Sequence, residues 1–424
     1  MPLKGRAINI LLLSSIVILF YAIKTRPFVI RNETKQDWGY PKDSLLNFTE
    51  LTMEYGYHSE EHTVLTEDGY LLKIFRVTKA KNCKGRKRSP PVILMHGLLQ
   101  SSDSWLDAGP NAGLAYLISD ACHDLWVANC RGNYYSRNHL ELDPDKNSQF
   151  WKFSVDEIGF YDVPSTIDYV LRHTGVEKVN YIGFSQGAGT FFIMCSERPG
   201  YCEKVNVLIT LAPAARQTNT KSVPYRLLTA AIMNIEGLLR KYEIYEIFSK
   251  GSFGQEFLAF FCQLNWLSGR VCSTGQSMLD AFHPESVAEH TTRSLFGHFP
   301  AGTSVHNMAR YGQSMVSEDF AKFDYGADNF KVYNSDYPPL YNLSAVSIPV
   351  VTIYGKNDGL VDVKDVEWLN DKLPNVVESF LVEDPYWNHL DVTYSRHTSV
   401  LVFPKINEYL LRYSVIQNLN RTGN

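Results

Sequence analysis

The chain lacks the features that mark several common protein classes. Its seven cysteines contain no CxxC pair and no spacing typical of a zinc site, and its 424 residues contain no internal repeat or low-complexity segment. Basic residues are not in excess, since 41 Lys and Arg stand against 45 Asp and Glu for a net charge of −4. Both signs are interspersed, so nothing points to nucleic acid as a partner. A hydrophobic content of 45% with 20% charged residues fits a globular protein.

The N-terminus has the pattern of a segment that enters the secretory route. Basic "MPLKGR" precedes the apolar run "AINILLLSSIVILFYAI", and Lys24 and Arg26 follow. The run is slightly short for a membrane span of ~20 residues and long for a signal core of ~7–15 residues. No clean small-x-small cleavage site is present. We therefore expect residues 1–24 to be a cleaved signal peptide, with an uncleaved signal anchor that attaches the protein to a membrane as the alternative.

Two further features agree with secretory topology. Asn-x-Ser/Thr sequons, which accept N-glycans, occur in polar or turn-like surroundings at Asn32, Asn47, Asn342 and Asn420. Seven cysteines leave at least one thiol unpaired, and their pairing cannot be deduced from sequence. Cys130 and Cys195 lie in apolar stretches, where we expect packed core residues rather than ligands.

Strand and helix patterns alternate through the first half of the chain. Residues 62–78 alternate around Asp68-Gly69, which predicts a hairpin. Short apolar runs predict strands buried on both faces, and helical spacing predicts the helices between them. The strands are expected within 90–99, 123–133, 179–187 and 205–213, and the helices within 156–175 and 187–199. This order predicts an α/β fold with a mostly parallel central sheet flanked by helices.

The alternation stops near Ala214 and resumes near residue 347. Residues 223–248 look amphipathic and helical, and residues 254–267 are apolar and aromatic. Strand patterns return at 348–358 and 377–392. We expect a cap or lid of helices at 214–346, inserted into a core formed by 51–213 and 347–415, with an N-terminal extension at 25–50.

The stretch "VNYIGFSQG" places Ser185 in a G-x-S-x-G pattern after a strand and before a helix. Such a turn forces the serine into a strained conformation, and the flanking Gly183 and Gly187 avoid clashes where strand and helix approach closely. The Oγ atom would then be exposed at the carboxyl edge of the sheet. The alternative is an ordinary polar loop residue, but the strand–turn–helix context favours a nucleophile.

A serine needs a base to take its proton and an acid to orient that base. In folds with this turn the chain order is Ser, then Asp or Glu, then His. Asp358 and His389 follow the last two predicted strands in that order. Taken singly, Asp358 is equally an Asx turn and His389 a surface histidine. Their order and position together favour a Ser185–Asp358–His389 triad, with Asp362 and Asp391 as the rival acids.

Two backbone N–H groups are needed to stabilise the oxyanion of an acyl-transfer reaction. One is expected from Gln186, directly after the nucleophile, and the other from Leu98, in the loop after an early strand. His96 precedes this loop, and we interpret it as a residue that shapes the loop. A general base is expected nearer the C-terminus.

"HSEEH", residues 58–62, matches a zinc pattern that depends on a helix to bring both imidazoles to one face. These residues run into the predicted hairpin. We therefore expect no metal site in this pattern, and no metal or organic cofactor for the chemistry described above.

Seven stretches resemble the acid lipase family of gastric and lysosomal lipases, and the resemblance runs from about Leu51 to about Leu411. They are "MHGLLQSSDSWL", "ANCRGNYYSRNH", "FWKFSVDEIGFYDVPSTIDYV", "YIGFSQG", "PAGTSVHNMARYGQ", "YGKNDGLVD" and "WNHLDV". The resemblance implies an α/β-hydrolase fold with a helical cap, and hydrolysis of triacylglycerols and steryl esters by a secreted or lysosomal enzyme. At matching positions it implies the same triad and the same oxyanion donors. It also implies a cap disulfide between Cys262 and Cys272.

One departure bears on substrate choice. Better-known members have histidine before the nucleophile, where this chain has Phe184. The substrate is expected to be a neutral lipid met at a lipid–water interface, with acyl chains held by cap residues such as Phe257, Phe260, Phe261 and Trp266. Two alternatives stay open: a carboxylesterase or thioesterase acting on small soluble esters, and a non-catalytic lipid-binding protein on the same scaffold.

Overall fold

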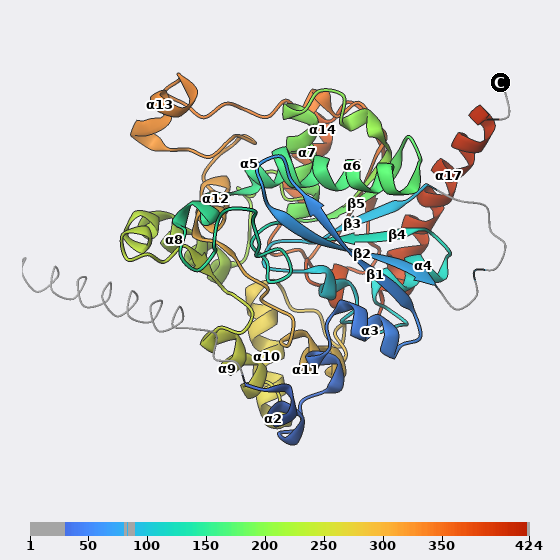
Figure 1. Ribbon diagram of the computed structural model, residues 1–424, viewed down its shortest axis with the longest axis vertical. Helices are drawn as coiled ribbons and strands as arrows, with labels where there is room; N and C mark the ends of the chain where they lie inside the picture. The colour runs from blue at the N-terminus through green and yellow to red at the C-terminus, as the bar shows by residue number, and fades with distance from the viewer. Residues whose placement is uncertain (1–29, 80–82, 84–89, 422–424) are drawn as a thin grey trace, which may run out of the picture.

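A computed structural model describes residues 30–79, 83 and 90–421, with side chains described up to residue 414 (Figure 1). Its main sheet has eight strands in the order β1-β2-β4-β3-β5-β6-β9-β10. They span His58–Leu65 (β1), Leu71–Lys79 (β2), Val92–Met95 (β3), Leu125–Ala128 (β4), Val179–Phe184 (β5), Val205–Leu211 (β6), Val350–Tyr354 (β9) and Val376–Leu381 (β10). The α/β-hydrolase architecture expected from the sequence is confirmed.

The hairpin predicted around Asp68-Gly69 forms the first two strands. β1 pairs antiparallel with β2, with Leu65 opposite Leu71, and β2 pairs antiparallel with β4. All pairs from β4 to β10 are parallel. The carboxyl ends of β3, β5, β9 and β10 therefore meet at one edge of the sheet, where ligands bind in open α/β folds.

Helices cover both faces of the sheet, as Figure 1 shows. Their bounds are Phe48–Glu54 (α3), Leu114–Asp120 (α4), Val155–Glu157 (α5), Val163–Thr174 (α6), Gln186–Glu197 (α7), Val363–Lys372 (α14) and Phe403–Arg421 (α17). One buried cluster joins the sheet to α6, α7 and α14, and a second joins its other face to α3, α4 and α17. Each central strand is therefore buried on both faces, which explains its continuous apolar run.

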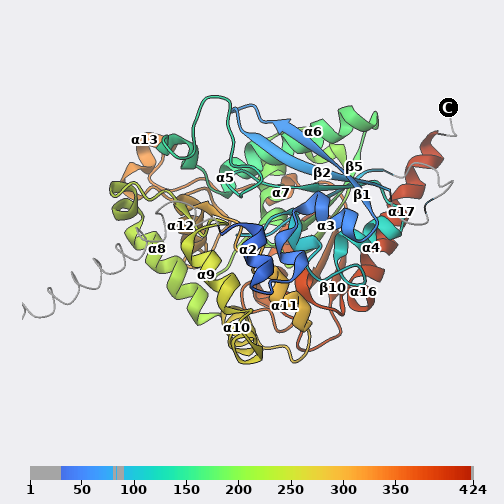
Figure 2. The same ribbon diagram turned by 60° about the horizontal axis from the view of Figure 1, so that its bottom comes forward.

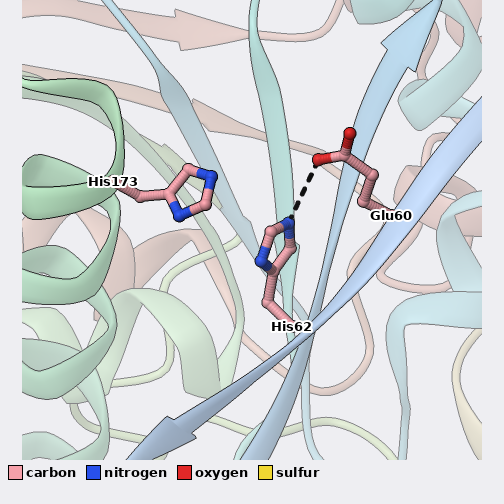
Figure 3. A group of neighbouring side chains, drawn as sticks. All are labelled: Glu60, His62 and His173. Carbon is pink, nitrogen blue, oxygen red and sulfur yellow. Dashed lines mark ion pairs between the residues drawn. The ribbon is translucent and has the colours of Figure 1, made fainter.

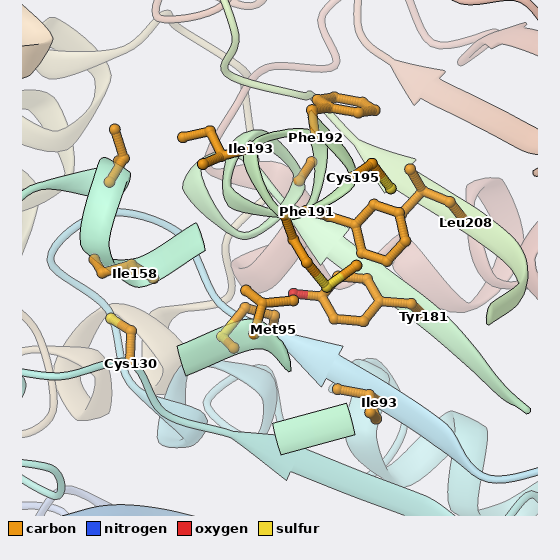
Figure 4. Packing of buried hydrophobic residues seen from close by; sticks show 14 of the residues in the cluster. Ile93, Met95, Cys130, Ile158, Tyr181, Phe191, Phe192, Ile193, Cys195 and Leu208 are labelled. Carbon is orange, nitrogen blue, oxygen red and sulfur yellow. The ribbon is translucent and has the colours of Figure 1, made fainter. Parts of the chain in front are cut away.

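The core around α7 is closely packed. Figure 4 shows Phe191 from α7 over Tyr181 from β5, and their ring centroids lie 4.7 Å apart. Met95 from β3 lies beside them in the same buried cluster. This packing fixes the direction in which β5 enters α7.

A helical insertion separates β6 from β9 (Figure 2). Its helices are Val223–Lys241 (α8), Phe253–Phe261 (α9), Trp266–Leu279 (α10), Glu289–Leu295 (α11), Val305–Ser314 (α12) and Asn329–Tyr333 (α13). It also holds a two-stranded sheet of Glu246–Ile247 (β7) and Thr303–Ser304 (β8), which the helical pattern did not predict. We call residues 214–346, the range expected from the sequence, the cap.

The N-terminal extension packs against the cap. Helix α2, Asn32–Asp37, contributes Lys35, whose Nζ lies 2.8 Å from the Glu256 carboxylate of α9. Beside it, the Trp38 and Phe260 rings lie 5.5 Å apart. The extension therefore holds α9 from its outer side.

Two details differ from the sequence interpretation. The helix expected over 156–175 contains a π-helical turn at Ile158–Asp162, where Gly159 packs against Ile193 and the buried Asp162 accepts hydrogen bonds from Arg131. Cys195 is buried as expected, but it also forms a disulfide with Cys202.

The structure pairs six of the seven cysteines. Besides Cys195–Cys202, the bonds are Cys83–Cys122 and Cys262–Cys272, and buried Cys130 remains free. Within the described residues, no helix has the length and hydropathy needed to cross a membrane. The expected leader at 1–24 lies outside the described residues, as does the side chain of Asn420.

Candidate active site

Ser185 lies at the junction of β5 and α7 in a strained backbone conformation. Its φ is 51° and its ψ is −113°, backbone angles that residues other than glycine rarely adopt. The conformation is held by hydrogen bonds on both sides: Ser185 N–H donates to the Leu211 carbonyl, and Ser185 O accepts from Ala188 and Ala214. A strained residue kept by its surroundings is typical of a functional site.

The neighbouring glycines are needed for close packing. A Cβ atom on Gly183 would come within 2.6 Å of the Gly187 carbonyl oxygen. A Cβ on Gly187 would come equally close, at 2.6 Å, to the carbonyl oxygen of Met95 in β3. The steric reason given for G-x-S-x-G in the sequence therefore holds in atomic detail.

Asp358 and His389 are hydrogen-bonded to each other in loops that follow β9 and β10. Nδ1 of His389 lies 2.8 Å from Oδ2 of Asp358. The other oxygen of Asp358 accepts hydrogen bonds from the backbone N–H groups of Leu360 and Val361, at 2.8 and 2.7 Å. The carboxylate is thereby fixed in orientation.

His389 is brought to the serine turn by a ring contact. Its imidazole lies against the ring of Phe184, with centroids 4.8 Å apart, and Phe184 directly precedes Ser185. In this state Ser185 Oγ makes no hydrogen bond to His389 or to any other described residue. Apo structures often show such a catalytic bond as long or absent.

Burial and charge act in opposite directions on His389. Burial lowers the pKa of this imidazole, but the charge and hydrogen bond of Asp358, with a contribution from the Asp280 carboxyl group, raise it above its usual value. A base with a raised pKa accepts a proton more readily. The three residues of the predicted triad are nearly inaccessible, with 6% of Ser185, 4% of His389 and 1% of Asp358 exposed.

The backbone N–H group of Gln186 directly follows this serine at the start of α7, and the N–H group of Leu98 lies in the loop after β3. Neither group donates a hydrogen bond within the described residues. The Gln186 side chain is held away from them, since its Oε1 accepts from Asn307 at 2.9 Å and from Tyr311 at 3.3 Å. Both N–H groups are therefore available to an incoming oxygen.

His96 shapes the loop that carries Leu98. Its Nδ1 bonds to the Gly97 carbonyl at 2.8 Å, while its Nε2 accepts from the Cys130 N–H at 3.2 Å. Complete burial lowers the pKa of His96 to about 4, so the ring is neutral at physiological pH. Both nitrogens are occupied by the backbone, which leaves none for proton transfer.

The structure reveals a carboxylate that the sequence interpretation missed. Asp280, at the end of α10 in the cap, accepts hydrogen bonds from Gly359 N–H at 2.9 Å and from Leu390 N–H at 2.8 Å. These donors directly follow Asp358 and His389. Burial, and next the charge of Asp358, raise the pKa of Asp280 to about 8. In the sequence, Asp280 is an isolated aspartate in a cap segment with no clear strand or helix pattern, so nothing there indicates its contact with the two loops.

The rival acids serve other contacts. Asp362 accepts from Lys364 N–H at 2.9 Å as the N-cap of α14. Asp391 bonds to His283 at 2.6 Å and to Ser286. Arg131, after β4, forms ion pairs with Asp68 and Asp162.

Three sequon asparagines are on the surface. Asn32, Asn47 and Asn342 are exposed. Asn47 caps helix α3 by accepting from Glu50 N–H at 3.0 Å, and Asn342 accepts from Ser344 N–H at 3.2 Å. A glycan attaches to the amide nitrogen, so these oxygen contacts leave the acceptor atom available.

Comparisons with known proteins show the family to which the chain belongs. Residues 48–109 match the family described as a partial alpha/beta-hydrolase lipase region, and residues 90–393 match the alpha/beta hydrolase fold. "Lipase 1" of Drosophila melanogaster is 37% identical over 90% of this chain and 84% of its own. "Gastric triacylglycerol lipase" of Bos taurus is 35% identical over 86% and 91%. Human "Lysosomal acid lipase/cholesteryl ester hydrolase" is 33% identical over 87% and 91%.

Proposed function

The chain belongs to the acid lipase family of the alpha/beta hydrolase fold, and from this premise we propose that Ser185 is its nucleophile toward neutral lipid esters. The enzyme is a carboxylic ester hydrolase of lipase type that releases fatty acids. One observation carries the assignment of residues. The imidazole of His389 packs beside the strained serine turn while its Nδ1 is bonded to Asp358.

In the first step Ser185 Oγ attacks the ester carbonyl carbon and His389 Nε2 takes the hydroxyl proton. Asp358 holds the Nδ1–H tautomer and stabilises the imidazolium that forms. The raised pKa of His389 favours this proton transfer.

The carbonyl oxygen becomes an oxyanion, which the N–H groups of Leu98 and Gln186 would stabilise. One such donor is worth ~3–4 kcal/mol in the transition state. His389 then gives its proton to the departing alcohol, leaving the acyl group on Ser185. A water molecule, deprotonated by His389, attacks this ester and releases the fatty acid. No step requires a cofactor.

Exposed apolar side chains on the cap support a lipid interface over a small soluble ester. On α9 and α10, Phe257 is 52% exposed, Trp266 is 70% exposed and Leu267 is 57% exposed. Phe260 and Phe261, by contrast, pack in the cap's own core. Helix α10 leads from the exposed Trp266 to Asp280 at the catalytic loops. A surface that contacts lipid is thereby mechanically connected to the buried triad.

The compartment is the secretory pathway or the lysosome, as the disulfides and the relatives indicate. We propose that Asn32, Asn47, Asn342 and Asn420 carry N-glycans there, and that residues 214–346 act as the lid. Localisation of the tagged full-length chain in cells distinguishes a secreted protein from a lysosomal one.

A substrate panel tests the proposed function. Triolein emulsion, cholesteryl oleate and a dispersed short-chain ester are hydrolysed by wild type and by Ser185→Ala, each at pH 5 and pH 8. We expect wild type to prefer one of the long-chain lipids and the variant to be inactive on all three. Hydrolysis of the short-chain ester alone would favour the esterase alternative. Unchanged function in Ser185→Ala would favour a lipid-binding protein.

A further inference from the structure

A second group of chemically reactive side chains lies on the other side of the molecule. Glu60 and His62 are two residues apart on β1 and therefore lie on the same face of the strand. His173 of α6 faces them (Figure 3). One ligand atom from each lies within 4.8 Å of the other two. Nitrogen and carboxylate donors in this combination suit zinc and neighbouring transition-metal ions.

The orientation of His62 is fixed by a second residue. Its Nδ1 bonds to the hydroxyl group of Tyr169 at 3.1 Å, and its ring packs against Trp126 with centroids 4.9 Å apart. Metal-binding histidines commonly have their other ring nitrogen held in this way. The side chain of His62 is only 12% exposed, so its orientation is set by packing.

The remaining nitrogen of His62 is buried and faces Glu60. Nε2 makes no hydrogen bond of good geometry within the described residues, and Oε2 of Glu60 lies 3.4 Å from it as an ion-pair contact. Two ligands on a tetrahedral zinc ion, each at about 2.0–2.2 Å from the metal, are about 3.3–3.6 Å apart. The distance between His62 Nε2 and Glu60 Oε2 therefore already fits two ligand atoms on one zinc ion.

His173 completes the group with little movement. It is exposed on the last turn of α6, and its ring centroid lies 4.8 Å from that of His62. An exposed histidine can change its side-chain rotamer at small cost and bring a ring nitrogen closer to the other two ligands. Water can supply the fourth ligand.

Nearby charge does not oppose a cation strongly. Arg76 is the positive group that faces His62, and both branches of its guanidinium are bonded to Asp124, at 2.8 and 2.9 Å.

We propose that Glu60, His62 and His173 bind a divalent transition-metal ion that links edge strand β1 to helix α6. This departs from the expectation of no metal, which concerned the pattern His58–His62. His58 itself is bonded to Thr78 and lies outside the group. α6 leads into the amino end of β5, whereas Ser185 follows its carboxyl end. The ion therefore has a structural role, remote from hydrolysis.

Zinc titration of the full chain by calorimetry tests the proposal, after the protein has been treated with chelator and dialysed. We expect one ion per chain and a rise in Tm on adding zinc. Glu60→Gln and His173→Ala should each weaken affinity about tenfold or more, and His62→Ala should abolish binding. His58→Ala is the matched control and should bind zinc as wild type does.

Glu60→Gln and His173→Ala change exposed side chains, so we expect both variants to fold as wild type does. Circular dichroism and hydrolysis of a short-chain ester verify the fold in every variant. Equal zinc affinity in wild type, Glu60→Gln and His173→Ala would overturn the proposal, as would absence of zinc binding by wild type at 0.1 mM, on the order of the weakest specific sites.

Discussion

Asp280 of the cap accepts a hydrogen bond from the backbone N–H of Leu390 at 2.8 Å, directly beside the proposed base His389. Its other oxygen accepts from Gly359 N–H, beside Asp358. Two amides reinforce this arrangement, since Asn388 donates to the Ala281 carbonyl at 2.7 Å and Asn357 donates to the Phe282 carbonyl at 2.9 Å. The end of α10 thus ties the loop of the base to the loop of the acid.

Replacing Asp280 with asparagine should disturb this tie. An amide can accept from one of the two N–H groups but presents its own donors to the other. We expect kcat to fall about tenfold or more, with KM for a short-chain ester nearly unchanged, because the shift acts on the alignment of the triad. Glu285→Gln, a change at a side chain that is 89% exposed, is the control and should leave both constants as in wild type.

The same variant should change how stability depends on pH. The pKa of Asp280 is raised in the folded chain to about 8, from 3.8 in the unfolded chain, so the folded state binds the proton more tightly. Its contribution to stability is therefore full below pH 3.8 and is lost as the pH rises toward 8. In thermal unfolding from pH 4 to pH 8, the Tm of Asp280→Asn should rise relative to that of wild type as the pH increases, because only wild type loses this contribution. A constant difference in Tm would contradict the raised pKa.

Two glycine substitutions separate close packing from helix propensity. Gly187→Ala places a methyl group against the Met95 carbonyl and should destabilise the chain by ~1–3 kcal/mol, with loss of hydrolysis. Gly237→Ala, in α8, meets no atom within 4 Å and should stabilise it by ~0.5–1 kcal/mol. Denaturant unfolding measures both. Equal stability of the two variants would remove the steric reason for the serine turn.

The cap surface should matter for lipid and not for soluble substrate. Trp266→Ser removes an apolar side chain that is 70% exposed, and it should lower hydrolysis of triolein emulsion several-fold. Hydrolysis of a dispersed short-chain ester should stay as in wild type. Val400→Ser, at a side chain that is 68% exposed outside the cap, is the matched control. Equal loss on both substrates in Trp266→Ser would indicate damage to the fold rather than to interface binding.

Local patterns explain what the sequence could predict. The hairpin at Asp68-Gly69, the buried strands and the turn at Ser185 each depend on neighbouring residues, so their signals are short-range. The prediction of Asp358 and His389 depends on their positions after strands whose carboxyl ends meet at one edge of the sheet. Strand topology predicts which loops lie at the same edge of the sheet, but it does not predict the ring contact between Phe184 and His389.

Contacts between distant segments were beyond such patterns. Asp280 reaches Gly359 across 79 residues of chain, and nothing near either residue indicates the pairing. The disulfide between Cys83 and Cys122 was likewise open, because spacing does not determine pairing. His173 joins Glu60 and His62 only through the packing of α6 on the hairpin. These features depend on tertiary structure, which a single sequence does not encode locally.

Labelling with a serine-directed alkyl phosphonate, followed by mass spectrometry of the peptides, tests the central assignment most directly. The reagent reacts only with a serine whose proton a base can take, and it remains attached in place of the acyl group. We predict about one label per chain, on Ser185, formed as hydrolysis of triolein is lost, and no label on Ser185→Ala. A label on another residue, or full hydrolysis by Ser185→Ala, would contradict the assignment.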